Sequence, residues 1–464
     1  MKFIRRPGIG FEGGIRTLVD MLNLFQSNQM SELARAFCAR NTLFNDPFEP
    51  LTVVVQSFGL GQWLKLQLSD YHGISSNVDC LLPATFLWKL YQSLIPETQL
   101  LNESPYDRHR LTWRIMRLLK ANPGLASEID TYLTGAGDKD LRLHQLAAEL
   151  ALLFDEYLMF RPDWILQWQN QRRELTGHEA WQADLWSIIQ DDLQGNQGLH
   201  RATLHQRVLQ SLARQSNSQQ SNATHKRITI FGLSTLPPLQ LQTFEALAES
   251  TEVDIYFLNP CAHYWGDIVS EKDKARRSVR SLLSTVEPLI DEDYLEVGNP
   301  LLSSLGKQGR EYLELLLESN QVHSEELFLD LEEATALDVV KNDILNLTFG
   351  GEFGAECQPI PRQFNDTSIQ IHICHSRLRE VEVLHDQILH AIKQSSTLRL
   401  NDILVMMPDV AEYAPFIQSV FSGSLAYRIA DRSSVENSTL LSSFMNLLKL
   451  PELRLSGPEV MDLL

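Results

Sequence analysis

The spacing of apolar residues predicts that strands and helices alternate at both ends of this chain, on either side of a long helical stretch. Residues 51–57 (LTVVVQS) are almost wholly apolar and β-branched, which is typical of a strand buried on both faces. Residues 22–25 form another short apolar run, followed by a polar turn and a helix that opens at Ser31. This alternation over residues 21–83 predicts a parallel sheet.

Residues 84–226 have a helical pattern almost throughout. Within them, residues 140–160 carry apolar side chains at helical spacing on more than one face, so we expect a central, buried helix that ends before Pro162. The strand–helix alternation returns at residue 227. We therefore predict an α/β core made of residues 21–83 and 227–364, with residues 84–226 inserted as a helical subdomain.

A second α/β domain is expected to begin near Phe364 and to occupy residues 365–464. Residues 368–376 and 401–409 are predicted strands, residues 425–433 are strand-like, and residues 377–394 are a predicted amphipathic helix. The pattern stops partway through this domain, so we expect it to be truncated. Residues 1–20 are glycine-rich and patternless, and we interpret them as a disordered extension or a misassigned start that precedes Met21.

Composition excludes several classes of protein. Hydrophobic residues make up 44% and charged residues 21% of the 464, which predicts a large folded core. No apolar run approaches the roughly 18 residues that a membrane helix needs. The five cysteines are scattered without a CxxC pair, which fits a reducing, cytoplasmic location. Because the net charge is −19, any contact with DNA must be confined to a local patch or channel.

The turn between the first predicted strand and its helix has the layout of a phosphate-binding loop without its chemistry. Such a loop needs converging glycine N–H groups, a lysine for the outer phosphate oxygens and a Ser or Thr for magnesium. Residues 26–29 (QSNQ) contain neither glycine nor lysine. We therefore expect no ATP site at this position.

Two other positions lack the remaining parts of an ATPase. In the turn after residues 51–57, Gly59, Gly61 and Lys65 are followed by Leu66 instead of Ser or Thr, and a tight strand-to-helix turn explains both glycines. The predicted strand 227–234 ends without the carboxylate that would hold magnesium. Together these gaps favour a non-catalytic scaffold with no cofactor of its own.

Other candidate groups have weak patterns. Asp155 and Glu156 are adjacent on a helix and therefore point about 100° apart, which argues against a shared metal. His372 and Cys374 would share one face of a strand while His375 points away, so a packed strand is favoured over a metal site. HExxH and GxSxG motifs are absent from the sequence.

One helical segment is strongly basic. Arg110, Arg114 and Arg117 fall on one face of the predicted helix RHRLTWRIMRLLK. A solvated face is the default interpretation, and the wall of a DNA channel is the sharper one.

Several long strings resemble the gamma-chain family of exodeoxyribonuclease V, the RecC family, in its N-terminal portion. They run in order from about Met21 to the end and include FDEYLMFRPDW, LNPCAHYWGDI and SIQIHICHSRLREVEVLHDQIL. The resemblance implies degenerate superfamily 1 helicase-like domains with parallel sheets and a large all-helical insertion. It also implies a subunit of the RecBCD helicase–nuclease, in a heterotrimer with RecB-like and RecD-like subunits that hold ATP and magnesium.

The family resemblance further implies a role on DNA. A RecC-type subunit guides the 3′-ended single strand from a duplex end and recognises the Chi sequence in it. Carried over by local match, Chi recognition falls on six residues: Leu82, Trp88, Asp155, Glu156, Arg161 and Arg201. Tryptophan could stack on a base, and arginine could bind guanine edges or phosphates.

Simpler roles compete with these. Trp88 has the helical spacing of a core residue, and Arg161 could merely cap the carbonyls that end its helix. The chain also departs from the family pattern, because Leu152 replaces an acidic residue and Glu156 replaces an amide. The alternatives to DNA reading are an interaction scaffold that stabilises partner subunits and, less in keeping with the sequence, an active ATPase.

Overall fold

The computed structural model describes residues 22–41, 50–95, 104–125, 127–135, 137–170, 177–193, 199–217, 227–270, 272–276, 298–318, 322–332, 334–349, 366–430 and 438–449. The expected extension of residues 1–20 lies outside them. The chain divides into two compact units, Met1–Arg362 and Gln363–Leu464. Each unit is described by itself.

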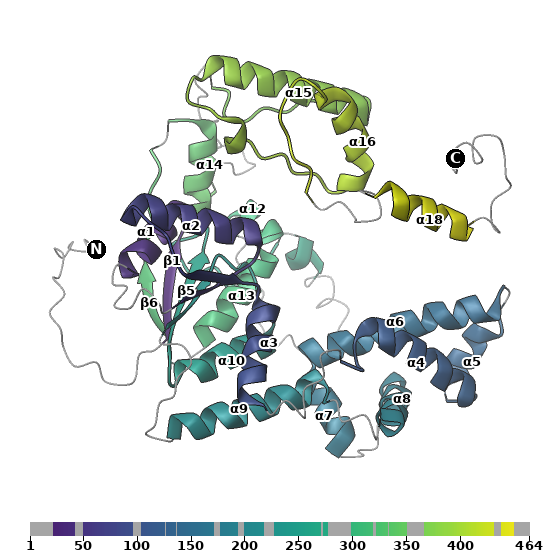
Figure 1. Ribbon diagram of the computed structural model, residues 1–464. Coiled ribbons are helices and arrows are strands. Elements are labelled where there is room, and N and C mark those ends of the chain that lie inside the picture. The colour runs from purple at the N-terminus through teal and green to yellow at the C-terminus, as the bar shows by residue number, and fades with distance from the viewer. Residues whose placement is uncertain are drawn as a thin grey trace, which may run out of the picture. The chain divides into compact units, whose positions relative to one another are not determined.

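The first unit is built on a parallel sheet (Figure 1). Its strands are β1 (Leu22–Ser27), β2 (Leu51–Val55), β3 (Val78–Leu81), β4 (Arg227–Phe231), β5 (Glu252–Leu258) and β6 (Val322–Glu326). They lie in the order β3-β2-β4-β5-β1-β6, and every adjacent pair is parallel. The α/β class and the parallel sheet predicted from the sequence are thus confirmed.

Helices cover both faces of this sheet because its central strands are apolar on both sides. Residues Thr52–Val55 of β2 are all buried, as the sequence predicted. On one face, α1 (Met30–Arg40) and α2 (Phe58–His72) cover Phe25, Val53, Val55 and Tyr256.

The opposite face carries the larger core. The side chains of Leu24, Val54, Ile230 and Ile255 point there from four different strands. They pack against α3 (Pro83–Leu94), α9 (Arg201–Asn217), α10 (Pro238–Ala248), α12 (Pro300–Leu305) and α13 (Lys307–Glu318). The first and last helices of the predicted insertion, α3 and α9, therefore belong to the core of the sheet.

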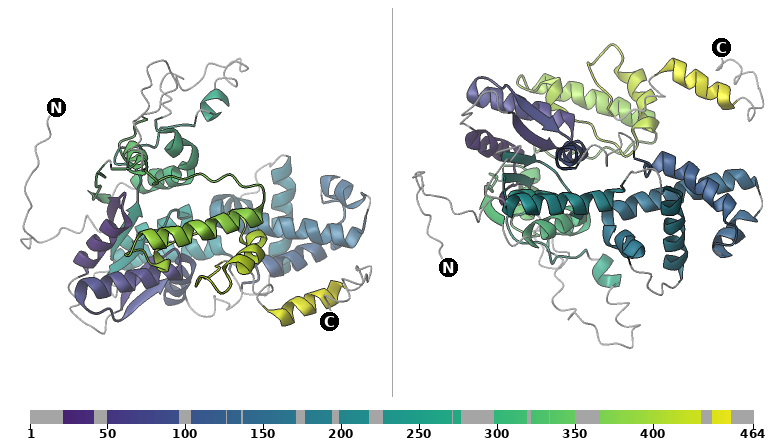
Figure 2. Two further views of the ribbon diagram at one scale, coloured as in Figure 1. Left: turned by 90° about the horizontal axis from the view of Figure 1, so that it is seen from above. Right: turned by 60° about the horizontal axis from the view of Figure 1, so that its bottom comes forward.

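The remaining helices of the insertion have a separate core (Figure 2). They are α4 (Arg108–Ala121), α5 (Ser127–Leu133), α6 (Lys139–Phe160), α7 (Pro162–Asn170) and α8 (His178–Leu193). Only one face of α6 is buried, including Leu143, Ala147 and Phe154, whereas Leu141 and Phe160 are exposed. The expectation that α6 is apolar on several faces because it is central was therefore wrong.

A charged network fixes the end of α1 to the sheet. Asp254 is fully buried in β5, where it accepts hydrogen bonds from Asn23 at 2.7 Å and from Arg40 at 2.7 Å. Arg40 also binds Glu252 at 2.5 Å, and Arg227 binds the other oxygen of Glu252 at 2.6 Å. The buried carboxylate is thus paired and hydrogen-bonded, which a buried charge requires.

The second unit contains α15 (Arg377–Gln394), η3 (Leu400–Asp402), α16 (Val410–Phe421) and α18 (Thr439–Lys449). The bounds of α15 are those predicted, with Ser376 capping it by accepting the N–H of Arg379. A small apolar cluster, which includes Val381, Ile388 and Ile417, joins α15 to α16.

The strands predicted for this second unit are absent from its described residues. Residues 368–374, 403–407 and 425–429 have no strand assignment, and the side chains of Ile371, Ile373 and Met406 are 85%, 97% and 84% exposed. A strand needs backbone hydrogen bonds to a neighbouring strand, so an alternating apolar pattern alone is insufficient. The remainder of residues 425–433 lies outside the described residues.

Candidate nucleic-acid interface

The turn between β1 and α1 is where a parallel sheet would hold a phosphate, since it lies at the carboxyl end of the strands and opens a helix. Only Asn28 and Gln29 separate β1 from α1. Ser27 Oγ accepts the N–H of Gln29 at 3.1 Å and donates to the carbonyl of Leu327 at 2.8 Å. The serine hydroxyl is therefore already used within the chain.

The neighbouring polar groups are also engaged by other side chains and backbone. Asn28 forms two hydrogen bonds with the backbone of Leu329, at 2.8 and 3.0 Å. Gln26 donates to Ser324 at 2.9 Å and accepts from Asn259 at 2.9 Å. These bonds cross from β1 to the segments after β5 and β6, so they close the end of the sheet at the expected phosphate position.

The glycines after β2 have a structural explanation that differs from the predicted turn. Both Gly59 and Gly61 lie inside the first turn of α2, and Ser57 caps this helix by accepting the N–H of Leu60 at 3.2 Å. A Cβ added at Gly61 would lie 2.8 Å from Cys80 Cβ, so Gly61 allows α2 to approach β3 closely. No comparable contact surrounds Gly59.

The end of β4 is apolar at the place where a magnesium-binding carboxylate would be needed. The chain turns at Gly232, whose φ of 64° favours glycine. A Cβ added there would lie 3.0 Å from Leu60 and 3.5 Å from Met30. The space above this strand is thus occupied by apolar side chains from α1 and α2.

Two of the residues predicted to recognise Chi are in contact. Arg201, at the start of α9, forms an ion pair with Asp155 of α6, with 3.1 Å between Nη1 and Oδ1. The side chains are 46% and 32% exposed, so both remain accessible to a ligand. Glu156, the next residue of α6, is exposed.

Leu82 and Trp88 lie on α3, which packs against α9. Leu82 is the N-cap residue of α3, and both side chains are partly buried. One turn after Trp88, burial raises the pKa of Tyr91 to about 12, although the nearby Thr243 hydroxyl and the charge of Arg201 act in the lowering direction. Arg201 thus lies close enough to α3 for its charge to act there.

Arg161 follows the last residue of α6. Its N–H donates to the carbonyl of Tyr157 at 2.9 Å, and its guanidinium lies 5.0 Å from the ring centroid of Trp164. The side chain is exposed. The contact with Trp164 holds it over an aromatic ring, an arrangement that also suits stacking against a base.

The three arginines of α4 occupy different environments. Arg114 and Arg117 both donate to Asp192 of α8, and Arg117 does so to both oxygens at 2.6 Å. Burial acts to raise the pKa of Asp192, but the hydrogen bonds from Arg117 and Arg114 outweigh it and hold that pKa below its usual range. Arg110 is exposed. A channel wall formed by all three stays a prediction, and Asp192 offsets part of its charge.

Sequence reasoning missed Asp192 and Trp113. Asp192 lies 75 residues from Arg117, and no local pattern joins them. The indole of Trp113 is 64% exposed on α4, 5.0 Å from the ring of His144. Its position between Arg110 and Arg117 at helical spacing is the signal that could have identified it.

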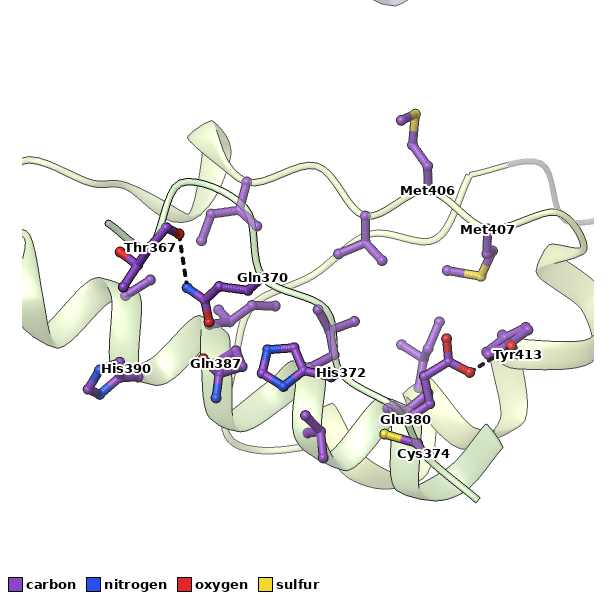
Figure 3. Close-up of a pocket in the computed structure, with 18 of the residues that line it drawn as sticks. Thr367, Gln370, His372, Cys374, Glu380, Gln387, His390, Met406, Met407 and Tyr413 are labelled. Carbon is purple, nitrogen blue, oxygen red and sulfur yellow. Dashed lines mark hydrogen bonds between the residues drawn. The ribbon is translucent and has the colours of Figure 1, made fainter. Parts of the chain in front are cut away.

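The second unit contains a cavity of about 720 Å³ between α15 and the extended segments on either side of it (Figure 3). His372 and Cys374 line this cavity and His375 does not, as the alternation predicted. Across the part of the chain that the structure describes, no group of three His, Cys, Asp or Glu residues could hold a metal ion. The same part of the chain has no helix long and apolar enough to cross a membrane.

Together, the parallel sheet and the engaged turns define an α/β protein whose phosphate position is occupied by its own side chains. The model of the RecC N-terminal domain family matches residues 22–347. Three relatives carry the name RecBCD enzyme subunit RecC. That of Escherichia coli K12 is 36% identical over 96% of this chain, that of Haemophilus influenzae is 31% identical over 96%, and that of Mycobacterium tuberculosis H37Rv is 26% identical over 90%.

The chain therefore belongs to the RecC family. It covers 42%, 44% and 38% of the lengths of these three relatives, so it spans about two-fifths of a RecC protein. The resemblance seen in the sequence is thus confirmed at the level of the family.

Proposed function

We propose that this chain is the N-terminal part of a non-catalytic DNA-binding subunit of a RecBCD-type helicase–nuclease. In this role it guides the 3′-ended single strand and recognises Chi during repair of double-strand breaks by homologous recombination. The single observation that carries the proposal is the pairing of Arg201 with Asp155 beside α3, in a chain that belongs to the RecC family. Three separated segments there bring together residues that the family resemblance marks for DNA.

The closed end of the sheet supports the non-catalytic part of this proposal. The hydroxyl of Ser27, the amide of Asn28 and the amide of Gln26 all bind within the chain. We infer that the sheet is a degenerate superfamily 1 helicase domain in which these bonds replace those to a nucleotide. ATP and magnesium would then be held by the RecB-like and RecD-like partner subunits, in the cytoplasm.

A scaffold that stabilises its partners without reading DNA is the second candidate. It is favoured by the pairing of Arg114 and Arg117 with Asp192, which reduces the positive charge available to a phosphate backbone. It is also favoured by exposed apolar side chains of the second unit, such as those of Ile371 and Leu404. The two candidates differ in whether substitutions near Arg201 alter DNA binding.

Replacement of Trp88 in the full RecC-type subunit, assembled with its two partners, tests the proposal. We expect Trp88→Ala to abolish the change in nuclease activity at a Chi sequence, while the folded subunit still assembles. Phe58→Ala is the matched control, since Phe58 is a 71% exposed aromatic residue of α2 outside the proposed set. A normal Chi response in the Trp88→Ala complex would exclude Trp88 as a reader and favour the scaffold.

A further inference from the structure

The helical subdomain contains a polar cavity of about 480 Å³ that the proposed function does not use. It lies where the segment before α4 meets α7, α8 and α9. Its lining includes the rings of Tyr106, Trp168, Trp186 and His200 and the amides of Gln169 and Gln190. Its volume falls in the range of small-molecule sites.

Trp186 supplies an unused hydrogen-bond donor in the wall of this cavity. The side chain is 1% exposed, and its indole N–H has no acceptor among the residues that the structure describes. The rings of Phe154, Tyr106 and His200 surround it, with centroids 5.3 to 5.6 Å away. Because this packing fixes the indole and a buried N–H is rarely left unpaired, the site calls for an acceptor from outside the chain.

His200 keeps this cavity uncharged on its opposite side. It is the residue before α9, and its Nδ1 accepts the N–H of Thr203 at 3.3 Å. Its Nε2 lies 3.0 Å from Thr203 Oγ1 and 2.6 Å from the amide nitrogen of Gln169. Burial lowers the pKa of His200 to about 4, so the ring is neutral at pH 7.

The chemistry of the lining selects an uncharged, planar ligand. Asp191 is the sole charged residue among those that form the described wall, and a carboxylate disfavours phosphate or another anion. Aromatic rings and amides together suit a flat ring that has hydrogen-bond donors and acceptors along its edge. A nucleobase has this combination, and an unstacked base offers both its faces and its edges.

We propose that this cavity receives a single base that is turned out of the single-stranded DNA passing along α9. The inference rests on the proposed DNA-binding function, because His200 directly precedes Arg201, whose ion pair with Asp155 marks the proposed path of the strand. The base would accept a hydrogen bond from the indole of Trp186 and leave its phosphates outside. Enzymes that act on bases use comparable aromatic pockets for extruded nucleotides.

The indole N–H resonances of this chain, labelled with ¹⁵N at tryptophan, provide a direct test. Trp186→Phe assigns the Trp186 signal, and Trp181→Phe assigns a control on the same helix whose N–H faces His178 at 3.4 Å outside the cavity. Titration uses 2′-deoxycytidine, a 20-nucleotide single strand and, as a ligand without a base, 2-deoxyribose 5-phosphate. Fluorescence anisotropy of the same labelled strand measures DNA binding independently.

We expect the nucleoside and the strand to shift the Trp186 signal and not that of Trp181, and the sugar phosphate to shift neither. Trp186→Phe should weaken strand binding about threefold to tenfold, as expected for one lost hydrogen bond, and Trp181→Phe should leave it unchanged. If the strand binds while Trp186 stays unmoved, the cavity proposal is overturned and the DNA-binding function survives. If neither anisotropy nor the Trp186 signal responds, both are overturned. The wild-type titration decides even if Trp186→Phe fails to fold.

Discussion

Arg201 and Asp155 form an ion pair that joins α9 to α6, with 3.1 Å between the guanidinium and the carboxylate. Both side chains are substantially exposed, and exposed pairs of this kind contribute about 1 kcal/mol or less to stability. The pair is therefore poorly explained by folding alone. It places a cation, with an acceptor beside it, on the surface that we propose for DNA.

Replacing Arg201 should affect DNA binding more than stability. We expect Arg201→Ala to weaken binding of a single-stranded oligonucleotide about tenfold and to lower the salt slope by about one, while Arg201→Lys keeps part of the affinity. Anisotropy titrations at several salt concentrations measure both quantities. An unchanged affinity and slope, in a variant with normal thermal unfolding, would remove Arg201 from the interface.

The network around Asp254 gives the opposite prediction. Arg40→Ala removes the guanidinium 2.7 Å from a fully buried carboxylate, and leaving such a charge without its partner costs about 3 to 5 kcal/mol. Urea unfolding should therefore show a large loss of stability. Arg35→Ala is the matched control on the same helix, because Arg35 is 68% exposed beside Glu32 and its loss should cost less than about 1 kcal/mol. Similar losses in both variants would contradict this account of the network.

Nucleotide should leave the stability of the chain unchanged. A ligand present at about 100 times its dissociation constant adds about 2.7 kcal/mol to the folded state. Because Ser27 and Asn28 are bound to Leu327 and Leu329, we expect MgATP at millimolar concentration to produce no shift in the thermal unfolding midpoint. Differential scanning fluorimetry with and without MgATP measures this, and a reproducible rise of several degrees would show that a nucleotide binds.

His200 should make stability depend on pH below neutrality. Its folded pKa of about 4 lies below the ordinary value of 6.5, so between these values the unfolded chain binds the additional proton. The contribution of the neutral ring is complete above about pH 6.5 and is lost as the pH falls toward 4. At pH 5 the loss amounts to about 2 kcal/mol.

His200→Asn isolates this effect, since asparagine can also cap α9 but does not titrate. Urea unfolding at pH 7 and pH 5 should show a smaller loss in the variant than in the wild type, by about 2 kcal/mol. Burial also lowers the pKa of His205, but His205 is present in both proteins and cancels in the comparison. Equal losses in the two proteins would mean that His200 is already charged when folded.

The elements predicted best from the sequence were those whose pattern is local. Strand β2 is apolar because helices cover it on both faces, and α15 shows its cap and amphipathic period in the sequence itself. The strands expected at residues 368–376 and 401–409 failed because a strand also needs a neighbour, which a pattern cannot supply. The residues described in the second unit provide none.

The site was predictable in its identity and not in its contacts. The family resemblance marked Asp155 and Arg201, yet their ion pair depends on α6 and α9 packing together across 46 residues of chain. The partner of Arg114 and Arg117, Asp192, was equally distant. The pairing of the arginines with Asp192 follows from the tertiary packing of α4 against α8, which periodicity alone does not reveal.

The two-residue connection between β1 and α1 makes the loss of a motor hard to reverse. A phosphate-binding loop needs several consecutive residues, glycines among them, between its strand and its helix, whereas only Asn28 and Gln29 stand there. Substituting single residues cannot lengthen the backbone. Regaining fuel binding would require an insertion at this turn together with the release of the segment around Leu327 and Leu329, so descendants of such a chain are committed to working with borrowed energy.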